Sequence, residues 1–143
     1  MNPSEFITVC GLPLIFMAQI AIALFLAVLF VQSGLDKVFN WKGNKEWLTG
    51  HFANSPLSGM VGFMLFVITV LEVSAGALSG IGGILLILGG SSTWAIYGVF
   101  LSCISLIALF FGQRMAQDYA GAGGLVPYFI VTIIGFWLFS IPA

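Results

Sequence analysis

The sequence has very few charged residues. Four Lys or Arg and five Asp or Glu make up 6% of its 143 residues, against 60% hydrophobic residues. A water-soluble domain carries about 25% charged residues, because its surface must be hydrated. Nine charged side chains are too few for that surface, which excludes soluble enzymes of this length. Four cations are also too few to follow a nucleic-acid backbone, so the expected partner is the lipid bilayer and not a nucleic acid.

Cysteine and histidine are scarce as well. Cys10 and Cys103 have apolar neighbours and form no Cys-x-x-Cys pair, and His51 is the only histidine. These counts exclude a disulfide framework, a zinc site with Cys/His spacing and a haem held between two histidines. We therefore expect no metal and no intrinsic cofactor, and we assign no catalytic residue. Whether the protein is an enzyme stays open, and a non-catalytic role is the favoured interpretation.

Long uncharged hydrophobic stretches are what the sequence has instead. A helix needs about 20 apolar residues to cross a bilayer. Four stretches predict spans within a single transmembrane domain (residues 1–143), over residues of about 13–34, 57–88, 93–111 and 125–141. Short connections place successive helices antiparallel, so we predict an all-α integral membrane protein that folds as a four-helix up-down bundle.

Glycine-rich segments locate the turns between these spans. Two segments can end the second helix, residues 79–83 and Gly89-Gly90-Ser91-Ser92. We favour the second, because it combines helix breakers with small polar residues. Gly121 and the pair Gly123-Gly124 are expected to stop the third helix, with Pro127 in the first turn of the fourth.

The connection over residues of about 36–56 mixes aromatic and charged side chains. This mixture favours the headgroup region of a membrane, so we expect an interfacial segment that can include a short amphipathic helix. All cations fall on the side of the first and third connections, namely Lys37, Lys42, Lys45 and Arg114. The positive-inside rule places that side in the cytoplasm and both termini outside.

Glu72 is the one charged residue inside a predicted span. An acidic side chain near the middle of a bilayer costs about 2.5–3.5 kcal/mol on insertion scales, so it should face the protein interior. Gly76, Gly80 and Gly83 follow close to the same helix face and allow another helix to pack closely. Two interpretations stay open. Glu72 accepts a proton or binds a ligand, or it is a neutral buried acid that joins two helices.

Other polar residues gather at the end of the bundle that carries the first connection. With Glu72 they form a candidate intramembrane polar site, whose remaining members are Gln32, Asp36, Lys37, Gln113, Arg114, Gln117 and Asp118. Most of them lie four residues apart in pairs, and each such pair shares a helix face. We expect the four charged residues of this set to form an interhelical network, with Glu72 deeper. The network either closes the bundle end with salt bridges or binds a substrate or a quinone head.

Three segments of the chain carry a characteristic combination of glycine and polar residues. They are Phe30-Val31-Gln32-Ser33-Gly34-Leu35-Asp36-Lys37, Leu71-Glu72 with the glycine-rich sequence after it, and Gln113-Arg114-Met115-Ala116-Gln117-Asp118-Tyr119-Ala120-Gly121 with Val126-Pro127-Tyr128-Phe129 just beyond. Together they resemble the DoxX family of small four-helix bacterial membrane proteins, over nearly the whole chain. That family is named from a subunit associated with a thiosulfate:quinone oxidoreductase, and other members look like partners of redox or thiol-handling systems. The resemblance implies that Asp36, Lys37 and Glu72 match recurring polar residues of the family.

The sequence supports three functional hypotheses. The first is a non-catalytic, DoxX-like subunit or accessory component of a larger, redox-associated complex in the bacterial inner membrane. Other membrane subunits or further copies of the chain are its expected partners. The second is a redox-associated component that handles a quinone or a lipid near Glu72. The third is a small proton-coupled transporter that uses Glu72 as its carrier site.

The assigned orientation predicts the reactivity of a cysteine introduced next to Lys42. In intact cells this cysteine should resist a membrane-impermeant thiol reagent, because it lies in the cytoplasm. Labelling of the same variant after permeabilisation is the control for its reactivity. Ready labelling in intact cells would show that the orientation is inverted.

Overall fold

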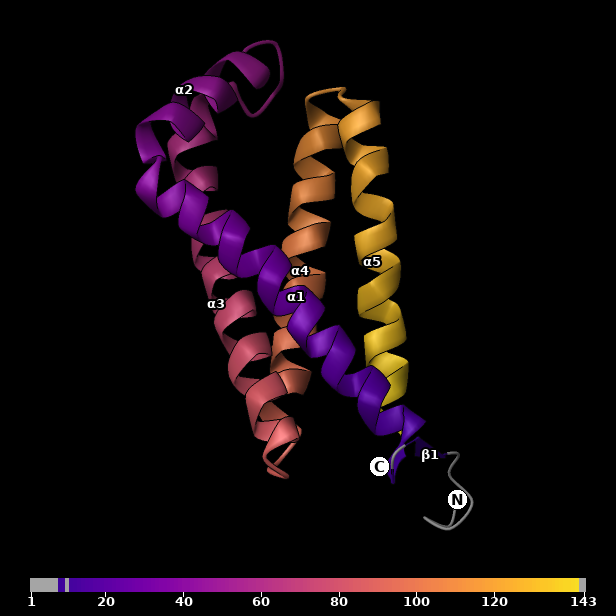
Figure 1. Ribbon diagram of the computed structural model, residues 1–143. Helices are drawn as coiled ribbons and strands as arrows, with labels where there is room; N and C mark the ends of the chain where they lie inside the picture. Colours follow the sequence, from indigo (N-terminus) through magenta and orange to yellow (C-terminus); the bar gives the residue numbers. More distant parts are fainter. Residues whose placement is uncertain (1–7, 10, 142–143) are drawn as a thin grey trace.

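The computed structural model describes residues 8–9 and 11–141, so Cys10 lies outside the described residues. Two short antiparallel strands, β1 (Thr8–Val9) and β2 (Leu12–Pro13), precede the first helix. The helices are α1 (Leu14–Phe39), α2 (Trp41–His51), α3 (Val61–Ile87), α4 (Thr93–Met115) and α5 (Tyr119–Phe139), with a 3₁₀ turn (Ser58–Met60) before α3. This architecture confirms the predicted all-α class (Figure 1).

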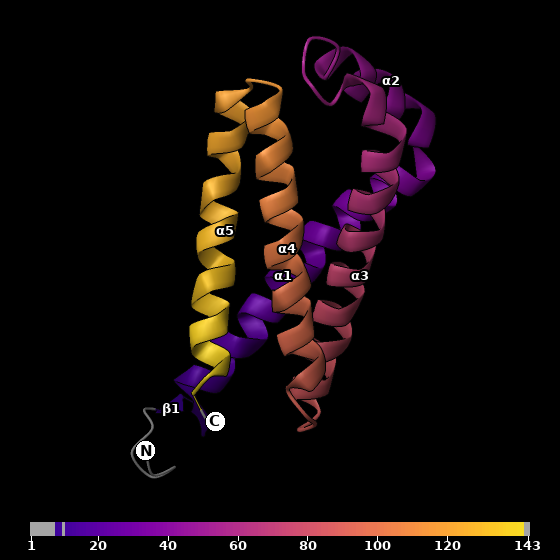
Figure 2. The same ribbon diagram turned by 180° about the vertical axis from the view of Figure 1, so that it is seen from behind.

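The four long helices α1, α3, α4 and α5 run alternately up and down (Figures 1 and 2). α1 starts near the C-terminal end of α5 and crosses the others obliquely to end beside α3. Gln19 ties the lower end of α1 to α5, because its side-chain Nε2–H donates to the Leu138 carbonyl at 3.0 Å. The start of α1 and the end of α5 lie at one end of the bundle, and α2 and the α4–α5 connection lie at the other (Figure 1).

All four long helices are long and apolar enough to cross a membrane. Many large hydrophobic side chains on their outer faces are exposed, among them Phe63, Phe66, Phe100 and Trp137. In water such a surface would aggregate, whereas in a bilayer it contacts acyl chains. The chain is therefore a multi-pass membrane protein.

Glycines allow α1 and α3 to pack closely. A Cβ on Gly76 of α3 would lie 2.6 Å from the backbone nitrogen of Val31 on α1, so only glycine permits this approach. Gly80 and Gly83 also face α1, and a Cβ on either would meet side chains of α1 at 3.6 and 3.1 Å respectively. The three glycines selected from the sequence thus lie along the contact between α1 and α3.

The contact between α3 and α4 depends on small residues near one end only. A Cβ on Gly82 would overlap the backbone of Ala95, and a Cβ on Gly98 would overlap Ser79. The two helices are close there and diverge toward the end that carries α2 (Figures 1 and 2). Large apolar side chains of both helices, among them Phe63 and Phe111, line the space between these diverging ends.

The turn between α3 and α4 lies at Gly89, as favoured from the sequence. Gly89 has a φ of +79°, and the N–H of Gly90 donates to the Leu85 carbonyl at 2.7 Å, which is the usual glycine-dependent helix end. The alternative turn at residues 79–83 is instead part of α3. Its residues Ser79, Gly82 and Gly83 are buried between α1 and α4.

The expected end of the third helix is wrong. Gly121 and the pair Gly123-Gly124 do not stop this helix, because α4 ends at Met115 and all three glycines lie in the first two turns of α5. Pro127 consequently lies inside α5 and not in its first turn. The last helix starts at Tyr119, six residues before the predicted position 125.

The helix break comes from Gln117 and Asp118 instead. Gln117 adopts a left-handed φ of +59°, and the N–H of Asp118 donates to the Gln113 carbonyl at 2.9 Å. This is the same cap that glycine usually makes, with glutamine in the left-handed position. The carboxylate of Asp118 then accepts the N–H of Gly121 at 2.9 Å and caps α5. A side-chain cap therefore outweighed the helix-breaking tendency of three glycines.

The first helix is also longer than predicted. α1 continues to Phe39, five residues beyond the expected end at residue 34, which keeps Lys37 on its last turn. α2 then occupies residues 41–51 of the segment that we expected at the interface.

The close contact of α3 and α4 predicts opposite effects for two Gly→Ala variants. Gly82→Ala should destabilise the protein by about 1–3 kcal/mol, because its Cβ would overlap the backbone of α4. Gly124→Ala should be neutral or stabilising by up to about 1 kcal/mol, because its Cβ meets nothing and alanine favours helix. Thermal unfolding in one detergent compares the two. Equal stability of Gly82→Ala and the parent would contradict the described contact.

Candidate functional site

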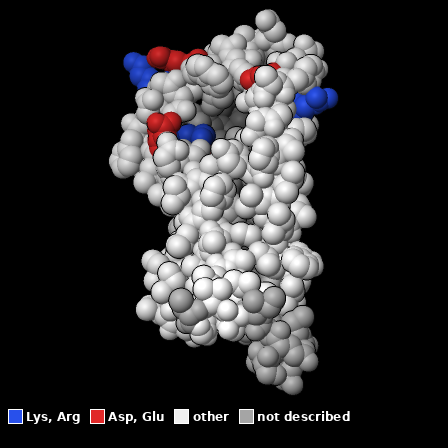
Figure 3. Space-filling view, turned by 45° about the vertical axis from the view of Figure 1, so that its right-hand side comes forward, with Lys and Arg blue, Asp and Glu red and all other residues white. Residues whose placement is uncertain are grey.

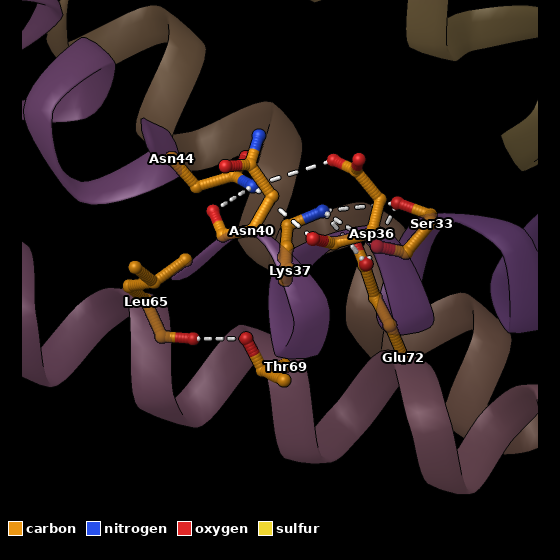
Figure 4. Close-up of polar contacts among 8 residues, drawn as sticks. All are labelled: Ser33, Asp36, Lys37, Asn40, Asn44, Leu65, Thr69 and Glu72. Atoms are coloured by element: carbon orange, nitrogen blue, oxygen red, sulfur yellow. Dashed lines mark hydrogen bonds and ion pairs between the residues drawn. The ribbon is translucent and has the colours of Figure 1, made fainter. Parts of the chain in front are cut away.

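A buried ion pair joins α1 and α3. The Nζ of Lys37 lies 2.9 Å from Oε2 of Glu72, whose side chain is 1% exposed, while that of Lys37 is 15% exposed. Ser33, one helical turn before Lys37, completes the cluster (Figure 4). Its hydroxyl donates to Glu72 Oε2 at 2.8 Å and accepts from Lys37 Nζ at 2.9 Å. We call Ser33, Lys37 and Glu72 the ion-pair cluster.

The helix contact described above creates this cluster. Ser33 and Lys37 are four residues apart, so both side chains lie on the face of α1 that meets α3. Between them, Gly34 lets α3 approach, since a Cβ there would lie 2.8 Å from Cγ2 of Val73. Glu72 is fully buried at this crossing, as its position among small residues predicted. Its second oxygen, Oε1, is buried without a hydrogen-bond partner within residues 8–9 and 11–141.

A second polar cluster joins three other elements. Nε2 of His51 on α2 lies 2.6 Å from Oε1 of Gln113 on α4 and 3.7 Å from Oδ2 of Asp118 at the start of α5. Trp47 stacks on the His51 ring with centroids 4.5 Å apart. We call His51, Gln113 and Asp118 the His51 cluster. It connects the end of α2 to the α4–α5 turn, while the remaining contacts of α2 are with α1 and α3.

The single charge network expected from the sequence is therefore divided. Lys37 joins Glu72, and Asp118 faces His51. Asp36 is exposed and accepts a hydrogen bond from the Asn44 side chain at 3.3 Å. Arg114 lies over the Tyr119 ring, 4.4 Å from its centroid, and makes no ion pair with any described carboxylate.

The remaining two glutamines of the candidate set take no part in either cluster. Gln32 and Gln117 are both exposed, and Gln117 contributes its backbone to the helix end. The site therefore contains four of the eight predicted polar residues in two clusters: Lys37 with Glu72, and Gln113 with Asp118.

A cavity of about 420 Å³ lies between the two clusters, where α3 and α4 diverge. Its walls are mostly apolar, and Lys37 is the only charged residue among the described residues that line it. The other polar side chains that line it are Asn44 and Gln113, while Trp47, Leu48 and Phe52 close it from α2. A largely apolar cavity with a few polar groups is typical of a small-molecule site. In Figure 3 the visible charged side chains lie at this end of the molecule, around a hollow.

Several of these residues were not selected from the sequence. Ser33 lies four residues before Lys37, so the two share a helix face. This spacing is the sequence signal for Ser33, but it appears only when hydroxyl side chains are considered together with charged ones. His51 lies in the segment expected at the interface, and its partner Gln113 is 62 residues away, so no local spacing in the sequence connects the two. The sequence does not indicate that Trp47 and Phe52 line a cavity, because aromatic residues in such a segment are expected at the membrane interface in any case.

No family model, no curated protein and no solved structure shows a significant match to this chain. The geometry of the two clusters and the cavity therefore carries the functional argument.

The ion-pair cluster predicts a strongly non-additive pair of substitutions. Lys37→Met should destabilise the protein by about 3–5 kcal/mol, because it leaves Glu72 buried without a counter-charge. The double variant Lys37→Met/Glu72→Leu should recover most of that loss, since no charge is then buried. Unfolding by a denaturing detergent measures each variant, and Lys42→Met, at an exposed cation, is the control. If the stability losses of the two single variants add up to the loss of the double variant, Lys37 and Glu72 do not interact.

Proposed function

We propose that this protein is a non-catalytic component of a redox-associated complex in the bacterial inner membrane, and that it holds a quinone or a lipid in the cavity beside Lys37. The DoxX resemblance supports the accessory role, and the cavity supports the ligand. The observation on which the proposal rests is that Lys37, the one charged residue among the described residues that line this largely apolar cavity, belongs to a buried ion pair.

The cavity suits an amphiphile more than a water-soluble metabolite. Its volume of about 420 Å³ falls in the range of about 300–1,000 Å³ that is usual for small-molecule sites. Lys37, Asn44 and Gln113 lie at the end of the cavity that also carries α2, while the α3 wall and the rest of the α4 wall are apolar. A ligand with a polar head and an apolar tail matches that distribution.

The outer surface supports association with other membrane subunits. α5 is the least enclosed of the four long helices, because only 22% of an 18-residue apolar stretch of it is buried. It packs mainly on α4 and leaves its other faces open. Helices in lipid associate through close packing of such open faces. The cavity is lined mainly by residues of α2, α3 and α4, with only Leu125 from α5, so a larger subunit docked on the other faces of α5 would leave it accessible.

The proton-carrier hypothesis has less support. A carrier carboxylate must exchange protons with both sides of the membrane. Glu72 instead shares Oε2 with Lys37 and Ser33, and it does not line the cavity, whose wall there is formed by Lys37.

Capture from native membranes tests the proposal. Extraction in a mild detergent followed by mass spectrometry should recover larger membrane subunits in fixed ratio, together with about one quinone or lipid per chain. Ala108→Phe should lose the small molecule and retain the subunits, because Ala108 lines the cavity. Ala77→Phe, at an exposed alanine outside the cavity, should retain both. A chain recovered without subunits and without a bound amphiphile would contradict the proposal.

A further inference from the structure

The charge in the cavity wall is balanced. Among the described residues that line the cavity, Lys37 is the only charged one, and Glu72 neutralises its charge at 2.9 Å. Asp36, Lys42 and Lys45 do not line the cavity and are exposed, so solvent screens all three. The cavity thus offers no unbalanced positive charge to a ligand.

An anionic head could bind Lys37 only in competition with Glu72. If Lys37 turned toward the ligand, Glu72 would stay fully buried at the α1–α3 crossing without its counter-charge. If Lys37 stayed in place, the ligand and Glu72 would be two negative charges near one ammonium. Both arrangements are unfavourable in an apolar environment, because an uncompensated buried charge loses its hydration.

A neutral head with a hydrogen-bond acceptor meets a weakly engaged donor instead. Two N–H groups of Lys37 bond Ser33 Oγ and Glu72 Oε2 at 2.9 Å, and the third makes only a long hydrogen bond to the Ser33 carbonyl, at 3.5 Å. Gln113 also lines the cavity, but His51 engages its Oε1, and its Nε2 lies toward Gly121 and Asp118. A carbonyl oxygen of a ligand can accept from the third N–H of Lys37 without disturbing the ion pair.

The cavity is continuous with the lipid-facing surface. Phe63 of α3 and Phe111 of α4 line it and are 65% and 55% exposed respectively. Both therefore border the space where α3 and α4 diverge and the outer surface that faces acyl chains. A tail that leaves the cavity between these helices reaches the bilayer core without crossing the polar end of the protein.

From these observations we infer that the cavity selects a neutral amphiphile whose head carries carbonyl acceptors, and that it discriminates against an amphiphile with an anionic head. The inference rests on the proposed ligand site and specifies its ligand class. A quinone ring and the ester head of an acylglycerol share this chemistry.

Two photoreactive probes with the same tail test this selectivity. A diazirine-tailed monoacylglycerol presents a neutral head, and the matching fatty acid presents a carboxylate. Each is cross-linked to the full chain in nanodiscs, and mass spectrometry compares labelling of Met64 and Ile68, which line the cavity, with labelling near the lipid-exposed Trp137. After this normalisation, the neutral probe should label the cavity about tenfold more than the anionic probe, a difference of about 1.4 kcal/mol.

Two variants of the ion-pair cluster test the role of charge in this preference. Glu72→Gln removes the counter-charge of Lys37, so labelling should shift toward the fatty acid. The double variant Lys37→Gln/Glu72→Gln has no charge in the cluster and should keep the neutral preference. If Glu72→Gln does not fold, the wild-type comparison and the double variant still decide the question. An added benzoquinone with a short isoprenoid tail displaces the neutral probe if the natural head is a ring dicarbonyl, and leaves it bound if the head is an ester.

The outcomes separate the selectivity from the ligand site itself. Cavity labelling by the fatty acid that equals or exceeds labelling by the monoacylglycerol in the wild type would overturn the inference and leave the amphiphile site standing. Labelling by both probes that is no greater in the cavity than near Trp137 would overturn the ligand site on which it rests.

Discussion

The burial of the Glu72 carboxylate is the constraint on which the arrangement of α1 and α3 depends. A carboxylate with no exposure in an apolar bundle needs a counter-charge and hydrogen-bond donors. Lys37 and Ser33 supply both from one face of α1. They reach Glu72 only because Gly34 and Gly76 let the two backbones approach to distances that no larger residue permits. The electrostatic requirement and the small residues thus support the same helix crossing.

The cavity is a consequence of where small residues are placed on α3. One side of α3 carries Gly76, Gly80 and Gly83, which keep it in close contact with α1. The side that faces α4 has small residues only near the connection at Gly89, where Gly82 and Ser79 meet Ala95 and Gly98. Two straight helices that touch at one end diverge at the other. α2 covers the opening, and its end is connected to α4 through His51 and Gln113. The polar end of the bundle is therefore open enough to hold a ligand.

Much of this architecture could be predicted from the sequence, because a bilayer imposes a simple length rule. Four long apolar stretches were enough to predict four helices, and the position of a lone acid among glycines was enough to place Glu72 inside the bundle. The partner of Glu72 was harder, because spacing along one helix says nothing about which residue of another helix it meets. The break between α4 and α5 was misplaced for a different reason. Asp118 forms a cap whose hydrogen bond outweighs three glycines, and glycine content alone does not reveal it.

The position of the ion-pair cluster is easier to explain by ligand selectivity than by stability. Replacing a buried ion pair with well-packed apolar residues is often neutral or stabilising, so a Lys–Glu pair offers no advantage as a helix fastener. Leucine and methionine at these positions would hold α1 against α3 at least as well, given the glycines that already bring the helices together. Apolar residues cannot supply a hydrogen-bond donor in the cavity wall. The Lys37 ammonium is such a donor, and its charge is already balanced. In the proposed ligand site, Lys37 supplies that donor and Glu72 balances its charge, which gives the cavity a polar contact that does not attract an anionic head.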